Sequence, residues 1–230
     1  GESGSGKSAT ALSVLQLLPY PSAHHPGGSI RIDGTELVGA PDATMQKIRG
    51  SRISIVFQEP LTSLNPLHTI ERQIGEILEV HRKVERGATR SRVLELLNEV
   101  GLPDAAERLK AYPHQLSGGQ RQRVMIAMAL ANDPEVLIAD EPTTALDVTI
   151  QAQILALLRR LQEERGMSVL LITHDLGIVR KVADRVCVMQ DGEIVEAGKT
   201  ESLFAAPQHA YTRMLLAAEP KGQPAAADPD

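Results

Sequence analysis

Short runs rich in apolar residues alternate with longer amphipathic stretches along most of the chain. The runs at 53–57, 136–139 and 168–173 carry no charge, which predicts strands buried on both faces of a sheet. Segments with helical spacing separate these runs. Strands that alternate with helices in this way are typical of an α/β domain with a mostly parallel sheet.

Two long stretches have helical periodicity. Between residues 69 and 131 apolar side chains recur at spacings of three and four, so we predict a helical subdomain over about 60–133, inserted between two strands. The residues that carry this pattern are Ile70, Ile74, Ile77, Leu78, Val93, Leu94, Leu96 and Leu97. A second long helix is expected over 147–165, with Gly166 as its C-terminal stop.

Shorter signals complete the pattern. Ala9–Leu18 predicts a helix that ends at Pro19, and Leu176–Ala183 predicts another. The pairs Asp33-Gly34 and Asp191-Gly192 follow strand-like residues, and such pairs are a strong signal of a β-hairpin. We therefore expect a small antiparallel β part in addition to the parallel sheet.

Composition narrows the classes of function. Of the 230 residues, 42% are hydrophobic and 23% are charged, which is ordinary for a globular protein. The net charge of -5 argues against nucleic-acid binding through overall charge, although it leaves room for a local basic patch. No apolar run is long enough to span a bilayer, and we see no signal peptide. Because the chain begins at Gly1, inside a motif, we expect the natural N-terminus to lie upstream.

The single cysteine and the histidines give no sign of a redox or metal site. Cys187 alone cannot form an intrachain disulfide, and its place in the apolar run Val186–Met189 predicts a buried thiol. Six histidines have no spacing typical of metal ligands, so we expect them on the surface. They are His24, His25, His68, His81, His114 and His209.

The first eight residues fit the phosphate-binding motif G-x-x-x-x-G-K-[ST]. Its glycines allow successive backbone N–H groups to turn towards phosphate oxygens, and the helix that follows adds its positive end. The lysine reaches the β- and γ-phosphates, and the last hydroxyl binds Mg²⁺. We therefore assign nucleotide binding to Gly1, Ser3, Gly4, Ser5, Gly6, Lys7 and Ser8.

An apolar strand at 136–139 ends in two acidic residues, Asp140 and Glu141. A buried strand holds the first carboxylate in place, and a hard cation such as Mg²⁺ prefers carboxylate oxygen. The second carboxylate, one residue further on, can act as the general base that activates water. A strand with a solvated acidic end is the simpler interpretation, but the phosphate-binding motif favours a magnesium and catalytic site.

The segment Leu116–Gln120 is a third motif. Ser117 is a natural cap for a helix over about 121–131, so Gly118, Gly119 and Gln120 stand at a second helix N-terminus that can face phosphate. Taken alone, this is a plain capped helix. Because it stands in the sequence between a phosphate-binding loop and a strand that ends in two acids, the motif becomes a highly specific sign of a nucleotide-binding domain.

These three motifs together resemble the nucleotide-binding domain of ABC transporters, over residues 1–218. The resemblance implies a P-loop NTPase with a RecA-like core, further N-terminal strands upstream of Gly1, and a linker or tail over 219–230. It also assigns Gln58 to sensing the γ-phosphate, Mg²⁺ and the attacking water. Asp147 belongs to the loop after the acidic strand, and His174 contacts the γ-phosphate.

The same resemblance implies the cofactors and the nearest partner. ATP and Mg²⁺ are expected, with Ser8, Gln58 and Asp140 at the metal. Two such domains form a dimer around two ATP molecules, so Ser117 and Gly119 of one domain close over the γ-phosphate held by Lys7 of the other. The aromatic residue that stacks on adenine lies upstream of the phosphate-binding motif in this family, so the preference for ATP over GTP rests on the resemblance.

Two further segments indicate a branch of the family. Glu59–Pro66 and Leu203–Thr212 resemble the ATP-binding subunits of dipeptide, oligopeptide and nickel importers, and in particular the first half of the tandem-domain ATPases of microcin C and oligopeptide uptake. Ala210 departs from the proline usual in the second segment. The resemblance implies membrane permease subunits, a periplasmic or extracellular substrate-binding protein, no nucleic acid, and a peripheral place on the cytoplasmic face of the membrane.

Two other classes of function stay open at this point. A soluble ABC ATPase of DNA maintenance would have long coiled coils between Lys7 and Asp140, and the sequence shows no sustained heptads there. A ribosome-associated ABC ATPase would be expected to carry basic surfaces for RNA. An inactive ATPase-like domain is disfavoured, because all the predicted site residues are intact.

Overall fold

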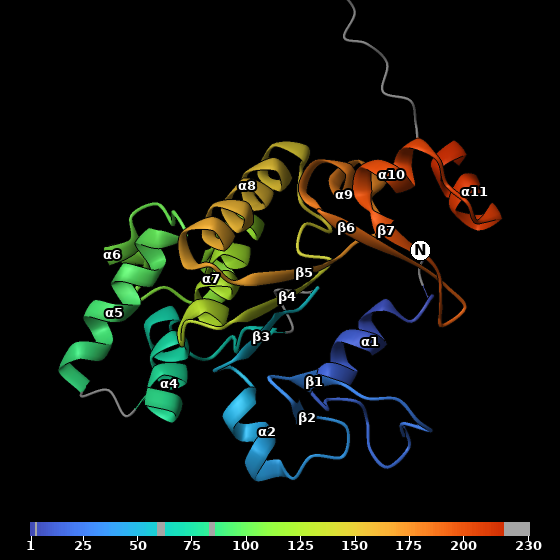
Figure 1. Ribbon diagram of the computed structural model, residues 1–230. Helices are drawn as coiled ribbons and strands as arrows, with labels where there is room; N and C mark the ends of the chain where they lie inside the picture. The colour runs from blue at the N-terminus through green and yellow to red at the C-terminus, as the bar shows by residue number, and fades with distance from the viewer. Residues whose placement is uncertain (3, 59–62, 83–85, 219–230) are drawn as a thin grey trace, which may run out of the picture. The chain divides into compact units, whose positions relative to one another are not determined.

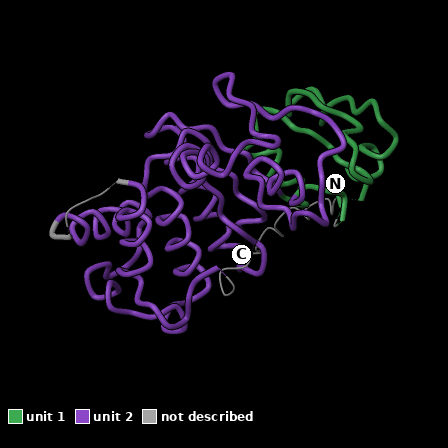
Figure 2. The backbone as a smooth tube through the Cα atoms, turned by 90° about the horizontal axis from the view of Figure 1, so that it is seen from below, with its two compact units in different colours: residues 1–7, 173–230 green, residues 8–172 purple. Residues whose placement is uncertain are grey.

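The computed structural model describes residues 1–2, 4–58, 63–82 and 86–218 (Figure 1). Ser3, the segment Glu59–Thr62 and the expected tail 219–230 lie outside the described residues. The chain forms two compact units, which are described separately below (Figure 2). The larger unit comprises residues 8–172, and the smaller unit comprises residues 1–7 with 173–230.

A parallel sheet forms the centre of the larger unit. Its strands are β3 (Ile53–Val56), β4 (Val136–Asp140) and β5 (Ser168–Ile172), in the order β3-β4-β5. Ile53 pairs with Val136, and Asp140 pairs with Ile172. The predicted parallel sheet is therefore confirmed, and the carboxyl ends of all three strands meet at one edge. The predicted burial of β5 on both faces is wrong, because Leu170 is 43% exposed.

Alternate residues of β4 enter two different hydrophobic clusters, as expected for a strand covered on both faces. Leu137 and Ala139 pack into a cluster with the apolar sides of α7 and α8. Ile138 packs into a second cluster, which contains residues of α1 and α2. Each of these three side chains is fully buried, so β4 is a rigid support for the acids at its end.

The helices predicted between β3 and β4 are present (Figure 1). Their apolar faces share the cluster that covers one side of the sheet. After β4 comes α8, which ends at Gly166 with a left-handed φ of 64°, as predicted. The bounds are α4 (Ile70–Arg82), α5 (Arg86–Glu99), α6 (Ala105–Arg108), the 3₁₀ helix η1 (Pro113–Gln115), α7 (Gly118–Leu130) and α8 (Val148–Arg165).

The beginning of the larger unit departs from the prediction in one respect. Helix α1 (Lys7–Val14) ends four residues before the predicted Leu18. Gln16 has a φ of 52°, which stops the helix, and the Arg49 guanidinium donates to the carbonyls of Leu15 and Gln16. Pro19 is therefore not what ends the helix. The hairpin at Asp33-Gly34 is confirmed, as β1 (Arg31–Ile32) and β2 (Thr35–Glu36), and α2 (Asp42–Ile48) follows.

The smaller unit is built on the second predicted hairpin. Strands β6 (Arg185–Gln190) and β7 (Glu193–Lys199) pair antiparallel on either side of Asp191-Gly192. Around them lie α9 (Leu176–Val182), α10 (Thr200–Ala205) and α11 (Ala210–Ala218).

The predicted burial of Cys187 is wrong. Its thiol is exposed, because side chains alternate along β6 and Val188 is the one that enters the hydrophobic cluster of this unit. Within the described residues, no helix is both long and apolar enough to cross a membrane.

Candidate nucleotide-binding site

The phosphate-binding loop has the backbone that its glycines predict. Gly4 has a φ of 81° and Gly6 a φ of 96°, in a region that side chains other than glycine rarely adopt. Between them Ser5 is buried, and its N–H donates to the Glu2 carbonyl at 3.3 Å. The loop thus curls tightly before α1 begins at Lys7.

The Lys7 ammonium is held inside this loop. It donates to the Gly1 carbonyl at 2.8 Å, to the Glu2 carbonyl at 2.6 Å and to Ser5 Oγ at 3.3 Å. These contacts fix a positive charge at the centre of the curl. A phosphate group that enters the loop meets both this charge and the first N–H groups of α1.

The loop packs closely against the β6–β7 hairpin of the same unit. A Cβ on Gly1 would lie 2.0 Å from the Met189 carbonyl oxygen, so only glycine fits there. The Gly192 N–H, in the hairpin turn, donates to the Ser5 carbonyl at 3.1 Å. The hairpin therefore supports the loop through backbone contacts that depend little on side-chain identity.

The carboxylates at the end of β4 occupy different environments. Asp140 is 6% exposed and belongs to the strand, whereas Glu141 has left the strand and is half-buried. Glu141 has a φ of 46°, a strained conformation for a residue with a long side chain. Its N–H donates to the Ile172 carbonyl at 2.9 Å, and the Thr144 hydroxyl donates to its carboxylate at 2.7 Å. Glu141 is thus held at both its backbone and its carboxylate.

The register of the sheet brings Gln58 to the same edge. Val56 pairs with Ala139 in the parallel ladder between β3 and β4. Gln58 and Glu141 each lie two residues beyond these partners, so both leave the sheet at neighbouring carboxyl ends. In α/β proteins this edge is where ligands bind.

The third motif forms a capped helix N-terminus. Ser117 Oγ accepts from the Gln120 N–H at 3.3 Å, and the Gln120 side chain accepts from the Ser117 N–H at 2.9 Å. This reciprocal pair is a capping box, and it satisfies two N–H groups at the start of α7. The contact of Gln120 with nucleotide stays a prediction, and its side chain here completes the capping box.

The beginnings of α7 and α8 lie against each other. A Cβ on Gly119 would lie 2.7 Å from Ile150 Cγ2, and a Cβ on Gly118 would lie 3.4 Å from Leu146 Cδ2. Asp147 caps α8 by accepting from the Ile150 N–H at 2.9 Å. Gly119 therefore allows the two helix N-termini to approach closely. This steric need for glycine cannot be predicted from the sequence alone.

His174 lies just beyond β5, in the smaller unit. Its side chain is exposed on a turn in which the Thr173 hydroxyl accepts from the Asp175 N–H at 3.0 Å. Asp175 in turn caps α9 by accepting from the Ile178 N–H. These hydrogen bonds fix the backbone of the turn, and the His174 side chain lies exposed to solvent.

The residues predicted to hold Mg²⁺ have suitable chemistry for that ion. Asp140 offers carboxylate oxygen from a buried strand end, and Ser8 offers an exposed hydroxyl in the first turn of α1. Mg²⁺ is usually bound by one or two such groups together with phosphate oxygens and water. The donor set therefore fits the ion as a complex with nucleotide.

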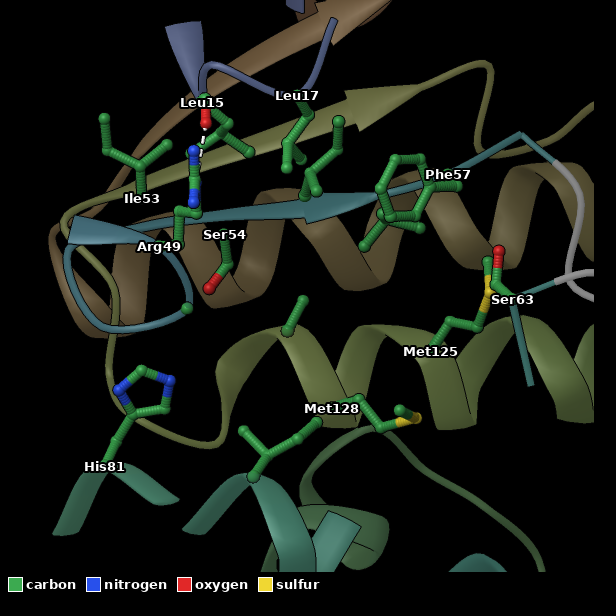
Figure 3. A pocket seen from close by; sticks show the side chains of 15 residues that line it. Leu15, Leu17, Arg49, Ile53, Ser54, Phe57, Ser63, His81, Met125 and Met128 are labelled. Atoms are coloured by element: carbon green, nitrogen blue, oxygen red, sulfur yellow. Dashed lines mark hydrogen bonds between the residues drawn. The ribbon is translucent and has the colours of Figure 1, made fainter. Parts of the chain in front are cut away.

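A cavity of about 630 Å³ lies along β3 in the larger unit, with α4 and α7 on one side of the strand and the segment after α1 on the other (Figure 3). Its walls are mostly apolar: Phe57 at the end of β3, Met125 and Met128 from α7, and Leu17 after α1 (Figure 3). Phe57 and Leu17 are 38% and 41% exposed, which is high for large apolar side chains. Since Phe57 precedes Gln58, the cavity opens next to the predicted catalytic edge.

Sequence reasoning missed three contacts of the site. The Thr144 hydroxyl orients Glu141, Ile150 packs over Gly119, and the Tyr211 hydroxyl bonds to the phosphate-binding loop. Thr144 could have been found by its position three residues after Glu141, since a threonine there can reach back within a turn. The other two contacts join segments far apart in sequence, and no local pattern indicates them.

Comparison with known proteins gives consistent matches. A sequence model of the family described as ABC transporter matches residues 1–144. The peptidoglycan transport ATP-binding protein YejF of Agrobacterium fabrum is 66% identical, over 99% of this chain and 42% of that relative. The dipeptide transport ATP-binding protein DppD of Bacillus subtilis is 53% identical, over 96% of this chain and 66% of that relative. This chain thus spans less than half the length of the first relative.

A solved structure agrees with the fold. The ATP-binding cassette MJ0796, determined as a dimer in a post-hydrolysis state with ADP and Pi bound, matches with a TM-score of 0.76 and 35% sequence identity. The match covers 87% of this chain and 83% of that chain.

Proposed function

The chain belongs to the ABC transporter family, and from this membership we propose that it binds and hydrolyses ATP to power the import of peptides through separate membrane subunits. The observation that carries the proposal is the carboxyl edge of the sheet. There a buried strand presents Asp140, Glu141 is oriented by Thr144, and Gln58 leaves the neighbouring strand.

Each group has a role in the proposed hydrolysis. The loop amides and Lys7 hold the β- and γ-phosphates. Bound Mg²⁺, held by Ser8 and Asp140, would neutralise charge on the phosphate oxygens. Gln58 positions the attacking water, and Glu141 accepts its proton as the water oxygen attacks the γ-phosphorus and the bond to the β-phosphate breaks. His174 donates to the γ-phosphate.

We propose that the site is completed by a second ATPase domain. Ser117 and Gly119 stand at a helix N-terminus, where N–H groups favour anions, and the matched MJ0796 cassette is dimeric. A second domain would bring its copy of this motif over the γ-phosphate. Groups that act in trans in other phosphoryl-transfer enzymes contribute about 10³–10⁵-fold in rate, so an isolated domain should hydrolyse ATP slowly.

The names of the relatives support a proposal for the transported substrate. One is named for dipeptides, another for oligopeptides and a third for peptidoglycan. These share short peptides as a chemical class, since peptidoglycan carries peptide stems. We therefore propose peptides or peptide-bearing wall fragments, delivered to the membrane subunits by a substrate-binding protein. The names of these relatives give no support to a soluble ABC ATPase of DNA maintenance or of the ribosome.

We propose that the membrane subunits bind at the apolar cavity beside Gln58, and that the chain lies on the cytoplasmic face of the membrane. A helix from a permease loop could cover Phe57 and Leu17 and fill the space between β3 and α7 (Figure 3). Burial of such side chains stabilises an interface by roughly 25 cal/mol per Å². Because Phe57 adjoins Gln58, movement of the permease would reach the water-positioning residue directly.

The test uses the full-length protein with Glu141→Gln. This variant keeps every group that binds ATP and loses the base, so it should hold ATP with hydrolysis nearly abolished. Purified from native membranes with ATP, it should bring polytopic membrane subunits and a peptide-binding protein, identified by mass spectrometry. Recovery of ribosomes or nucleic acid instead would sink the import proposal, and hydrolysis at the parental rate would exclude Glu141 as the base.

A further inference from the structure

Tyr211, in the first turn of α11, bonds directly to the phosphate-binding loop. Its hydroxyl accepts from the Glu2 N–H at 3.1 Å, and both residues belong to the smaller unit. The two residues are 209 positions apart in the sequence. The segment that contains Tyr211 resembles the importer branch, and none of the steps proposed above uses it.

The hydrogen bond acts on a peptide group that also holds Lys7. The N–H that Tyr211 binds and the Gly1 carbonyl belong to one planar unit. That carbonyl accepts from Lys7 Nζ at 2.8 Å, and the next one, of Glu2, accepts from Lys7 at 2.6 Å. Rotation of this peptide plane would move the carbonyl away from Lys7. Tyr211 therefore fixes the orientation of the Gly1 carbonyl, which in turn holds the Lys7 ammonium in place.

The tyrosine is itself held firmly. Its ring is 8% exposed and packs with Val188 of β6 and Leu203 of α10 in the hydrophobic cluster of this unit. Close packing against these two side chains leaves the ring little freedom, so the position of the Tyr211 hydroxyl is fixed.

The turn before α11 is fixed by side chains on both sides. The Glu196 carboxylate, on β7, accepts from the Gln208 N–H at 2.8 Å and from the His209 N–H at 3.1 Å. The Arg213 guanidinium donates to the Gln208 carbonyl at 2.7 Å. These bonds set where α11 begins, and so they set where Tyr211 can reach.

We propose that Tyr211 is a positioning residue for the phosphate-binding loop, and that α11 and nucleotide are coupled through it. The proposal rests on the proposed function, because it takes the loop to be the nucleotide site. Coupling of this kind is reciprocal: a docked α11 favours nucleotide binding, and bound nucleotide favours a docked α11.

The first test is Tyr211→Phe in the full-length protein with its membrane subunits. The substitution removes one oxygen and keeps the buried ring. Loss of one hydrogen bond should weaken MgATP binding, and raise KM for ATP, by about two- to tenfold. The kcat should stay near the parental value, because the loop holds phosphate equally before and during hydrolysis. The matched control is Tyr20→Phe, since the Tyr20 hydroxyl contacts Gln16 and His25 instead of the loop.

The second readout is hydrogen exchange of the α11 amides, which a merely structural tyrosine would not link to nucleotide. In the parent, MgATP should slow exchange over 210–218, and in Tyr211→Phe this nucleotide-dependent protection should be lost. The Tyr20→Phe control should keep it. Parental ATP affinity together with unchanged protection in a folded Tyr211→Phe protein would overturn the proposal.

Two variants separate the remaining outcomes. If Tyr211→Phe does not fold, Glu196→Gln tests the proposal instead. This variant loosens the turn before α11 without substituting Tyr211. A raised KM in that variant supports the proposal, and an unchanged KM contradicts it. Lys7→Ala tests the proposed function by itself: if it binds ATP as tightly as the parent, the loop is not the nucleotide site and the fault lies there, not with Tyr211.

Discussion

At the scale of single residues, the proposed general base is the most specialised part of the site. Glu141 lies in a left-handed conformation, and its carboxylate accepts from Thr144 at 2.7 Å. Strain of this kind persists only where surrounding contacts over-determine it. Here those contacts are the bond from the Glu141 N–H to the Ile172 carbonyl and the threonine hydroxyl. We infer that the threonine is needed to aim the base.

Thr144→Val removes this hydroxyl at nearly constant volume. We expect kcat for ATP to fall by about three- to tenfold, in line with the net contribution of one typical hydrogen bond, about 0.5–1.5 kcal/mol. Nucleotide affinity should stay at the parental value, because no phosphate contact changes. Steady-state ATPase kinetics measure both quantities. Thr149→Val, at an exposed position of α8, is the control, and equal kcat values for the two variants would contradict the role of Thr144.

At the scale of elements, two helix N-termini share one close contact. The beginning of α7 carries Gly118 and Gly119, and the beginning of α8 carries Ile150. Alanine in a helix is favoured over glycine by about 1 kcal/mol, so propensity alone predicts that either glycine could be replaced with a gain. At Gly119, however, an added Cβ would lie only 2.7 Å from Ile150 Cγ2, so alanine is disfavoured there.

Gly119→Ala should therefore destabilise the protein by about 1–3 kcal/mol, the usual cost of overpacking, and should lower ATPase activity. Gly118→Ala is the matched control, because its Cβ would make an ordinary contact of 3.4 Å with Leu146. The double variant Gly119→Ala with Ile150→Ala should recover most of the activity, since the clashing methyl group is gone. Urea denaturation and ATPase assays check this. Absence of rescue would show that the loss comes from elsewhere.

The attachment of α11 should depend on pH through Glu196. The Gln208 N–H, with the His209 N–H, holds the pKa of this carboxyl below its usual range. A carboxyl with a lowered folded pKa stabilises the fold above its unfolded pKa, about 4.3, and that contribution is lost as pH falls towards the folded value. The protection of the amides over 210–218 against hydrogen exchange, relative to an unfolded peptide at the same pH, should fall below about pH 4. Glu196→Gln should have low protection already at neutral pH and should lack this acid-dependent loss; the same loss at the same pH in the variant would refute the assignment.

At the scale of the whole molecule, the sequence predicts the parallel sheet, both hairpins and the long helices, because each depends on a local period or on a turn. Burial on both faces of β4 follows from its uncharged run, and the cap at Ser117 follows from residue type. The end of α1 could not be predicted, since Arg49 reaches it from another element. Cys187 was misjudged because an apolar run alone does not say which face of a strand is covered.

In the candidate site, too, features that depend on local sequence could be predicted, and contacts between distant segments could not. Motifs locate Lys7, Asp140 and Glu141, because their chemistry requires a fixed local spacing. The contacts of Tyr211 with Glu2 and of Ile150 with Gly119 join distant segments, and only the fold brings them together. Roles that depend on such contacts have no signature in a single sequence.

If ATP hydrolysis at Glu141 drives peptide import, transport and hydrolysis must stop together when this carboxylate is replaced. The full-length protein is reconstituted with its membrane subunits in vesicles that contain ATP, and uptake of labelled peptides from its substrate-binding protein is followed together with phosphate release. We predict that uptake and release occur together in the parent and that Glu141→Gln loses both while ATP stays bound. Uptake that continues in Glu141→Gln, or phosphate release that never accompanies uptake in the parent, would contradict it.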